Sequence, residues 1–134
     1  LALVRELDGV AYYNDSKATN VHAAVTGIRA MSRPLVAIVG GVDKQLPLEP
    51  LVDALASQAR HVVLIGEIAG RVAGCLAGRV GFEVAPTMED AVARARSAAR
   101  AGDAVLLAPA CSSFDMFRGF EHRGDVYEAA VRAL

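Results

Sequence analysis

The sequence predicts an α/β domain: a Rossmann-like, mostly parallel sheet of about six strands, with an N-terminal hairpin and helices on both faces. Two observations lead to this prediction. Runs of Val, Ile and Leu alternate along the chain with segments of helical periodicity, which is typical of buried strands joined by crossover helices. The 134 residues, 54% hydrophobic and 22% charged, fit one globular domain over residues 1–134.

The first segments predict a hairpin and a helix. Residues 2–7 and 10–13 are short apolar runs separated by Asp-Gly, which is a strong hairpin signal. After a polar stretch, apolar residues recur at i, i+3, i+4 and i+7 over residues 21–31, which indicates an amphipathic helix. Thr19 or Asn20 is expected to cap its N-terminus.

The rest of the chain alternates between strand and helix. Predicted strands cover residues 34–41, 61–67, 82–86 and 103–110. Predicted helices lie near residues 48–55, 68–76, 87–95 and 126–134, the third opened by a capping box of Thr87 and Asp90. Right-handed crossovers then place every strand-to-helix loop along one edge of the sheet, where open α/β sheets bind ligands.

Charge and cysteine usage exclude several classes of protein. The net charge of -1 predicts no nucleic-acid or membrane partner, and no apolar run reaches the roughly 18 residues of a membrane span. Cys75 is interpreted as a helix core residue and Cys111 as a buried small residue of a reduced, cytoplasmic chain. The three scattered histidines form no metal site. Because the chain begins at Leu1 rather than Met and shows no secretory signal, we expect a piece of a longer protein.

Three loops at the predicted edge are rich in polar side chains. Loop 1 is residues 14–20 (NDSKATN), loop 2 is residues 40–45 (GGVDKQ) and loop 3 is residues 108–124 (APACSSFDMFRGFEHRG). Lys17 and Lys44 each follow a strand close to an expected helix start, where an ammonium group adds to the preference of free N–H groups for anions. The pair indicates an anionic ligand with more than one charged group.

Simpler interpretations exist for the residues of loops 1 and 2. The two lysines could be solvated and paired with Asp15 and Asp43. Asp15 could accept hydrogen bonds from ribose hydroxyls or serve as a turn or capping residue. Gly40-Gly41 could let a ligand approach the backbone or only form a tight turn. The chain contains neither a dinucleotide glycine fingerprint nor a P-loop, which argues against an oxidoreductase and against a phosphate-binding loop of its own.

Loop 3 combines two serines with three phenylalanines. Ser112 and Ser113 offer hydroxyl groups to a ligand. Phe114 and Phe117 are three residues apart, a spacing more often found in cores than in ligand contacts. Cys111 follows a strand end, but no base stands beside it in the sequence, so it is not predicted to be a nucleophile.

The motifs NDSKATN, GGVDK and LLAPACSSFDMFRGFEHRG, in this order and spacing, resemble the C-terminal domain of the MurD family over essentially the whole chain. This resemblance implies a UDP-N-acetylmuramoyl-L-alanine:D-glutamate ligase, which forms an amide bond through an acyl phosphate in peptidoglycan synthesis. It implies ATP and Mg²⁺ as cofactors, bound mainly by a central domain, and an N-terminal domain for the UDP group. The implied partners are D-glutamate, ATP or ADP, UDP-N-acetylmuramoyl-L-alanine and the chain's own central domain.

From the positions of these motifs, the resemblance assigns binding residues for two ligands. The residues that the resemblance assigns to D-glutamate are Lys17, Thr19, Lys44, Ser113, Phe114 and Phe120. For Lys17 and Thr19 the reaction centre is the alternative. It assigns Asp15 to the nucleotide, with Asn14 as a second candidate. It assigns no catalytic residue and no metal ligand within the domain.

One departure and one gap qualify this resemblance. Gln45 stands where family members often have glycine, and the P-loop is missing, so the 134-residue chain alone is expected to have no ligase activity. The alternative is a free-standing nucleotide- or anion-binding module without catalysis. Such a module has no reason to combine Lys17, Thr19, Lys44 and Ser113.

Overall fold

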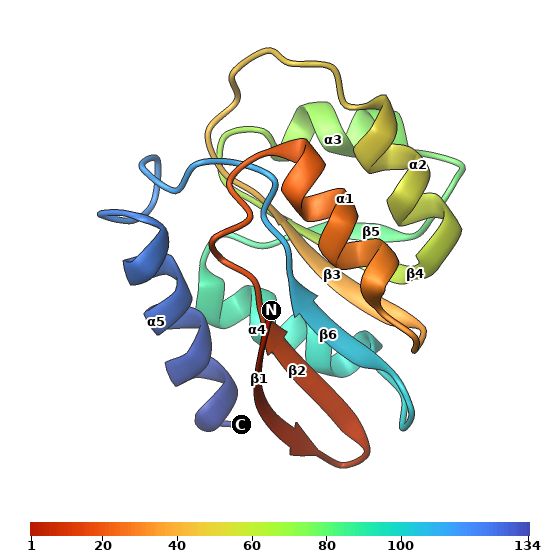
Figure 1. Cartoon of the computed structure of the whole chain (residues 1–134), viewed down its shortest axis with the longest axis vertical. Coiled ribbons are helices and arrows are strands. Elements are labelled where there is room, and N and C mark those ends of the chain that lie inside the picture. The colour runs from red at the N-terminus through yellow and green to blue at the C-terminus, as the bar shows by residue number, and fades with distance from the viewer.

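A six-stranded sheet runs through the centre of the computed structural model, which describes residues 1–134 (Figure 1). The strands are β1 (Ala2–Leu7), β2 (Val10–Asn14), β3 (Leu35–Gly40), β4 (Ala59–Ile65), β5 (Phe82–Val84) and β6 (Ala104–Leu107). The helices are α1 (Val21–Ala30), α2 (Glu49–Gln58), α3 (Ala69–Leu76), α4 (Met88–Ala98) and α5 (Phe120–Arg132).

The strand order β1-β2-β6-β3-β4-β5 confirms the predicted fold class. β1 pairs antiparallel with β2, and all other neighbouring strands are parallel. Asp8 and Gly9 both have positive φ values, 54° and 78°, as a two-residue hairpin turn requires. The Asp-Gly pair therefore places β1 at the edge of the sheet.

Helices cover both faces of the sheet. α1, α2 and α3 pack on one face, and α4 and α5 pack on the other (Figure 1). Successive residues of β3 alternate between the two cores, with Ala37 and Val39 on the α1 side and Val36 and Ile38 on the α4 side. A strand buried on both faces has no polar positions, which explains its continuous apolar run.

The prediction for Cys75 was wrong, because this side chain is exposed in α3. The buried residues of α3 are Ala69, Val72 and Leu76. With 3.6 residues per turn, Cys75 lies roughly 90° from the centre of that buried stripe. Cys111 is buried, as predicted.

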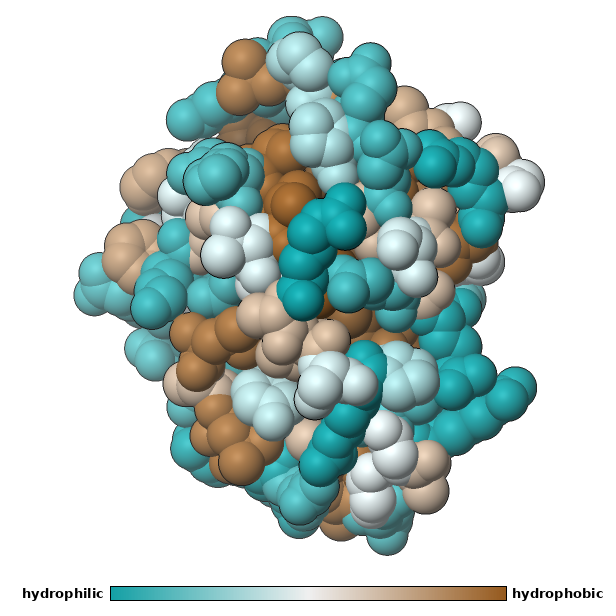
Figure 2. Space-filling model, turned by 45° about the vertical axis from the view of Figure 1, so that its right-hand side comes forward, coloured by the Kyte–Doolittle hydropathy of each residue, from teal (hydrophilic) through white to brown (hydrophobic).

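The surface carries no broad apolar area on the face shown in Figure 2, where hydrophobic residues form small groups between polar ones. None of the five helices combines the length and apolarity that crossing a bilayer demands.

Strand order decides which loops become neighbours. Loops 1, 3 and 2 leave the carboxyl ends of β2, β6 and β3, which are adjacent in that order. Loop 3 is shorter than predicted and covers residues 108–119, because α5 begins at Phe120. The chain leaves β6 toward α5 on one face, whereas β2 and β3 lead to α1 and α2 on the opposite face. Such reversals are the places where open α/β sheets bind ligands.

Candidate functional site

Backbone hydrogen bonds join loops 1, 2 and 3 into one surface. The Ala110 N–H donates to the Ala18 carbonyl oxygen over 3.0 Å, which ties loop 3 to loop 1. The Val42 N–H donates to the Ser112 carbonyl oxygen over 3.1 Å, which ties loop 2 to loop 3. Loop 3 therefore lies between the other two and is bonded to both.

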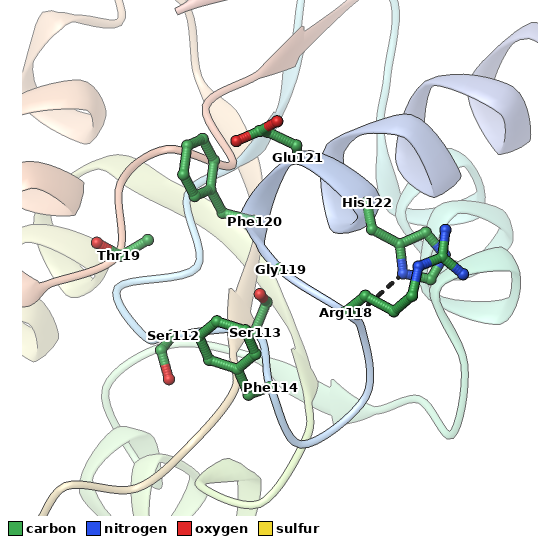
Figure 3. Close-up of a pocket in the computed structure, with 9 residues that line it drawn as sticks. All are labelled: Thr19, Ser112, Ser113, Phe114, Arg118, Gly119, Phe120, Glu121 and His122. Carbon is green, nitrogen blue, oxygen red and sulfur yellow. Dashed lines mark hydrogen bonds between the residues drawn. The ribbon is translucent and has the colours of Figure 1, made fainter.

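A cleft of about 450 Å³ opens where loops 1 and 3 meet α5 (Figure 3). This volume is within the range of small-molecule sites. Arg118 and His122 lie on the side of the cleft away from Thr19 (Figure 3). The Arg118 N–H donates to His122 Nδ1 over 3.0 Å, which holds these two residues together. The residues lining the cleft are Thr19, Ser112, Ser113, Phe114, Arg118, Gly119, Phe120, Glu121 and His122.

Ser113 lines this cleft, and its buried hydroxyl has no hydrogen-bond partner. Ser113 is 2% exposed, and its Oγ is one of three buried side-chain polar atoms that lack a partner. No side chain caps the neighbouring α5, so N–H groups of its first turn have no intrahelical acceptor. A helix N-terminus favours anions. Hydroxyl and helix end together form a place suited to a carboxylate or phosphate.

A smaller hollow beside the cleft contains Lys44. Residues of loops 1, 2 and 3 line it together with Arg71 of α3. It shares Thr19 and Ser112 with the cleft. These two residues therefore connect the Lys44 side of the site with the Ser113 side.

Lys17 lies beyond Phe120 rather than in the main cleft. It lines a hollow with Asn14 and Ser16 that shares Phe120 and Glu121 with the cleft. Four residues predicted to bind D-glutamate thus line the cleft, and Lys44 lines the adjoining hollow. Lys17 lies in a separate hollow on the other side of Phe120. The four are Thr19, Ser113, Phe114 and Phe120.

The two lysines are the only ones in the chain, and neither forms an ion pair. Asp43 binds Arg71 instead, and Asp15 forms no ion pair with either lysine. The simpler interpretation of the lysines as partners of Asp15 and Asp43 was therefore wrong. Both ammonium groups remain available to a ligand.

A comparison with known protein families shows which family the chain belongs to. The model of the family described as "Mur ligase, glutamate ligase domain" matches residues 1–111. The chain belongs to the Mur ligase family.

Curated relatives agree with this assignment, and a solved structure shares the fold. The UDP-N-acetylmuramoylalanine–D-glutamate ligase of Geotalea daltonii is 43% identical over 134 residues, and that of Aromatoleum aromaticum is 49% identical over 128 residues. The chain is covered to 100% and 95% in these matches but spans only 30% and 28% of the two relatives. A solved domain from Haemophilus ducreyi, named as a UDP-N-acetylmuramate:L-alanyl-γ-D-glutamyl-diaminopimelate ligase, has a TM-score of 0.65. It is 17% identical, covers 98% of each chain and shows the shared fold.

Loop 2 of this Mur ligase domain is held by an ion pair from α3. Arg71 donates to both carboxylate oxygens of Asp43 at 3.0 Å and to the Leu46 carbonyl oxygen at 2.8 Å. The hydrogen bond from Arg71 keeps the pKa of Asp43 below its ordinary value. Asp43 Oδ1 also accepts from the Gln45 N–H over 2.8 Å, and Gln45 has a φ of 60°. The loop thus keeps a conformation that favours glycine while carrying glutamine.

Gly40 and Gly41 serve backbone packing. A Cβ at Gly40 would lie 1.9 Å from the Ile65 carbonyl oxygen, and one at Gly41 would lie 2.3 Å from the Ser112 carbonyl oxygen. The backbones that approach these glycines belong to β4 and loop 3. Neither a ligand nor a tight turn is needed to explain them.

Loop 1 divides its polar residues between structure and site. Asn20 caps α1 by accepting from the Ala23 N–H over 2.9 Å, which leaves Thr19 in the cleft. The Asn14 amide donates to Glu128 over 2.7 Å and accepts from the Ser16 N–H over 2.9 Å. Asn14 therefore fastens α5, and its amide keeps one N–H and one lone pair for the predicted contact with a nucleotide.

Asp15 and the phenylalanines of loop 3 and α5 differ in their exposure to solvent. Asp15 is 6% exposed, and its Oδ2 lies 2.8 Å from where a Cβ at Gly27 would stand. Phe114 is 73% exposed and Phe120 is 42% exposed, so the core interpretation of Phe114 was wrong. Phe117 is half-buried against the α4–α5 core.

Burial raises the pKa of the Cys111 thiol to about 11, which keeps it protonated.

Sequence reasoning missed the residues that hold the loops together. Glu67, which lies outside loops 1, 2 and 3, accepts from the Asp43 N–H over 2.8 Å, and its own N–H donates to Asp115 over 2.9 Å. Arg123 of α5 is fully buried, and burial lowers the pKa of its guanidinium to about 10. No local pattern distinguishes these charged residues from solvated ones, because their partners are distant in sequence.

Proposed function

We propose that this domain is the C-terminal part of a MurD-type ligase and that it binds D-glutamate across the cleft and the Lys44 hollow. The main support is that a buried, unpartnered Ser113 hydroxyl stands beside an uncapped helix N-terminus, and that a hollow lined by the unpaired Lys44 adjoins this place. Two connected sites for negative charge suit a dicarboxylic amino acid. A single-anion module would use only one of them.

The chain's own residues then bind and orient the amino acid. The Lys44 ammonium pairs with one carboxylate, while the Ser113 hydroxyl and the N–H of Phe120 hold the other. Thr19 lies between the two sites and contacts the ligand there, and the exposed Phe114 covers it. Fixing both carboxylates directs the amine toward the activated substrate, which lowers the entropic cost of the attack.

Asp15 and Lys17 face the nucleotide side in this proposal. Asp15 would accept hydrogen bonds from the ribose, and Lys17 would contact charge at the reaction centre, with Asn14 as a second nucleotide contact. ATP supplies the phosphoryl group that activates the carboxylate of UDP-N-acetylmuramoyl-L-alanine. No three His, Cys, Asp or Glu side chains of the domain lie together as they would around a metal ion. We assign Mg²⁺ and the P-loop to the central domain of the whole ligase.

The whole ligase would work in the cytoplasm in peptidoglycan synthesis, and the two free cysteines are consistent with a reducing compartment. The isolated 134-residue chain should release no phosphate from ATP, because the P-loop lies outside it. Turnover by this chain alone in a coupled phosphate-release assay would contradict that expectation.

Lys44→Ala in the full-length ligase tests the glutamate site. Losing a charge-assisted bond should raise the KM for D-glutamate about 10- to 100-fold, with the KM for ATP within about twofold. Arg33→Ala is the matched control, since Arg33 pairs with Glu6 near the opposite edge of the sheet. An unchanged KM for D-glutamate in the Lys44 variant would remove Lys44 from the site.

A further inference from the structure

Arg123 presents a buried charge without a carboxylate partner. Its residue is 0% exposed, and its three hydrogen bonds go to oxygen atoms of neutral groups. Burying an arginine in this way costs free energy, and a well-packed hydrophobic residue is often at least as stable in such a place. The position of the charge therefore calls for an explanation other than stability.

The three bonds join segments that are distant in sequence. Arg123 Nε donates to Ser16 Oγ over 2.9 Å, and Nη2 donates to the Ser16 carbonyl oxygen over 2.6 Å. Arg123 Nη1 donates to the Cys111 carbonyl oxygen over 2.8 Å. Ser16 Oγ in turn donates to the Phe120 carbonyl oxygen over 2.6 Å. One guanidinium thus connects loop 1, loop 3 and the first turn of α5.

These connections lie directly behind the cleft. Thr19 follows Ser16 by three residues, Ser113 follows Cys111 by two, and Phe120 is itself a bonded residue. The three cleft groups are thereby set relative to one another by a single planar side chain.

The packing of α5 leaves little room for this arrangement to shift. A Cβ at Gly124 would lie 3.0 Å from Asn14 Nδ2 and 3.3 Å from Ser16 Cβ. The helix therefore rests closely on loop 1, and the residue next to Arg123 has to be small.

We propose that Arg123, acting through Ser16, is a positioning residue that fixes the spacing between the Thr19 side and the Ser113–Phe120 side of the glutamate site. This inference rests on the proposed function, since it concerns the same cleft. Arginine suits the role because its rigid fork donates in several fixed directions at once, whereas lysine offers one mobile ammonium.

Three variants of the full-length ligase test this proposal. Ser16→Ala removes one oxygen and breaks the link to Phe120, while Arg123→Met fills the buried volume without charge. Both should raise the KM for D-glutamate about 3- to 10-fold and leave the KM for ATP within about twofold. Arg123→Lys should restore part of the loss seen with Met. Melting temperatures of all variants are measured alongside the kinetics.

A positioning role and a purely structural role give different results. Either role leaves the buried Ser16 and Cys111 carbonyl oxygens of Arg123→Met without their donor, so the melting temperature should fall. Positioning predicts in addition that the KM for D-glutamate rises while the KM for ATP stays within about twofold, whereas a purely structural role predicts equal changes in both. The control is Arg60→Met, which removes a guanidinium paired with Asp103 at the other end of the strands and should lower the melting temperature without changing either KM.

The outcomes that overturn the inference are equally definite. An unchanged KM for D-glutamate in both Ser16→Ala and Arg123→Met, or equal rises in both KM values, would show that Arg123 does not position the site. Absence of D-glutamate-dependent phosphate release by the unmutated ligase would instead overturn the proposed function, and this inference with it.

Discussion

The two ends of the sheet treat buried charge in opposite ways. At the amino end, the Asp103 carboxylate is 1% exposed and accepts from Arg60 Nε at 2.9 Å, from Arg60 Nη2 at 3.0 Å and from the Arg100 N–H at 2.9 Å. At the carboxyl end, the equally buried Arg123 meets only neutral oxygen atoms. One end pairs its charge with an opposite charge, and the other uses its charge to hold loops.

This contrast indicates that the domain sacrifices folding stability for ligand binding at the carboxyl end of the sheet. The charged groups at the amino end satisfy each other, although the buried Gln58 Oε1 there has no hydrogen-bond partner. At the carboxyl end the Ser113 hydroxyl, two ammonium groups and an uncapped helix remain without partners. Local rules for stable folding fail most often at functional sites, so the unsatisfied end is the one expected to meet a ligand.

The largest expected effect comes from breaking the pair at the amino end. Asp103→Asn should lower the free energy of unfolding by about 2 kcal/mol at pH 7, because charge-assisted bonds to a buried group are lost. Urea denaturation measures this. The KM for D-glutamate should stay unchanged in the full-length ligase, since Asp103 is remote from the cleft. Asp53→Asn, at an exposed pair with Arg79, is the control and should change little.

Acid should reveal the same pair. Burial alone would raise the pKa of Asp103, but hydrogen bonds from Arg60 and from the Arg100 N–H outweigh it and hold the pKa below 3.8. Below about pH 4 the unfolded chain therefore binds more protons than the folded one, and stability falls as pH falls. Asp103→Asn should lose less stability between pH 5 and pH 3 than the unmutated protein does. Parallel acid profiles would mean that the pair contributes nothing.

A smaller effect is expected on the nucleotide side of the carboxyl end. Gly27→Ala would place a Cβ 2.8 Å from Asp15 Oδ2 and push the carboxylate aside, so the KM for ATP should rise about 3- to 10-fold in the full-length ligase. Gly74→Ala is the matched control, because it adds the same methyl group to a helix where nothing lies within 4 Å. If both variants keep the normal KM for ATP, Asp15 does not contact the nucleotide.

The smallest effect concerns backbone strain in loop 2. Gln45→Gly should stabilise the domain by about 0.5 kcal/mol, because glycine adopts a φ of 60° without the Cβ clash but loses more chain entropy. Gln45→Ala keeps the strain and should bring no gain. Chemical denaturation compares the two, and a destabilised glycine variant would show that the Gln45 side chain stabilises the loop in some other way.

Sequence reasoning reached the fold because its signals are local. The Asp-Gly pair at Asp8 marked the hairpin, and apolar runs marked β3 and β6. The capping box at Thr87 is real in part, since its hydroxyl accepts from the Asp90 N–H over 3.1 Å. Cys75 was misplaced because apolar spacing in α3 fits two neighbouring faces. The motifs also singled out Thr19, Lys44 and Ser113, but not the geometry that connects them.

The alternation of strands and helices, and the sheet edge that carries the polar loops, follow from local sequence patterns, because hydrophobic period and turn chemistry act over a few residues. Three relations depend on the three-dimensional fold instead: β6 inserts between β2 and β3, Lys17 stands apart from the cleft, and Arg123 joins loop 1 to loop 3. Those relations link residues up to 107 positions apart. Chain closure over such distances depends on packing of the whole domain, which no local pattern records.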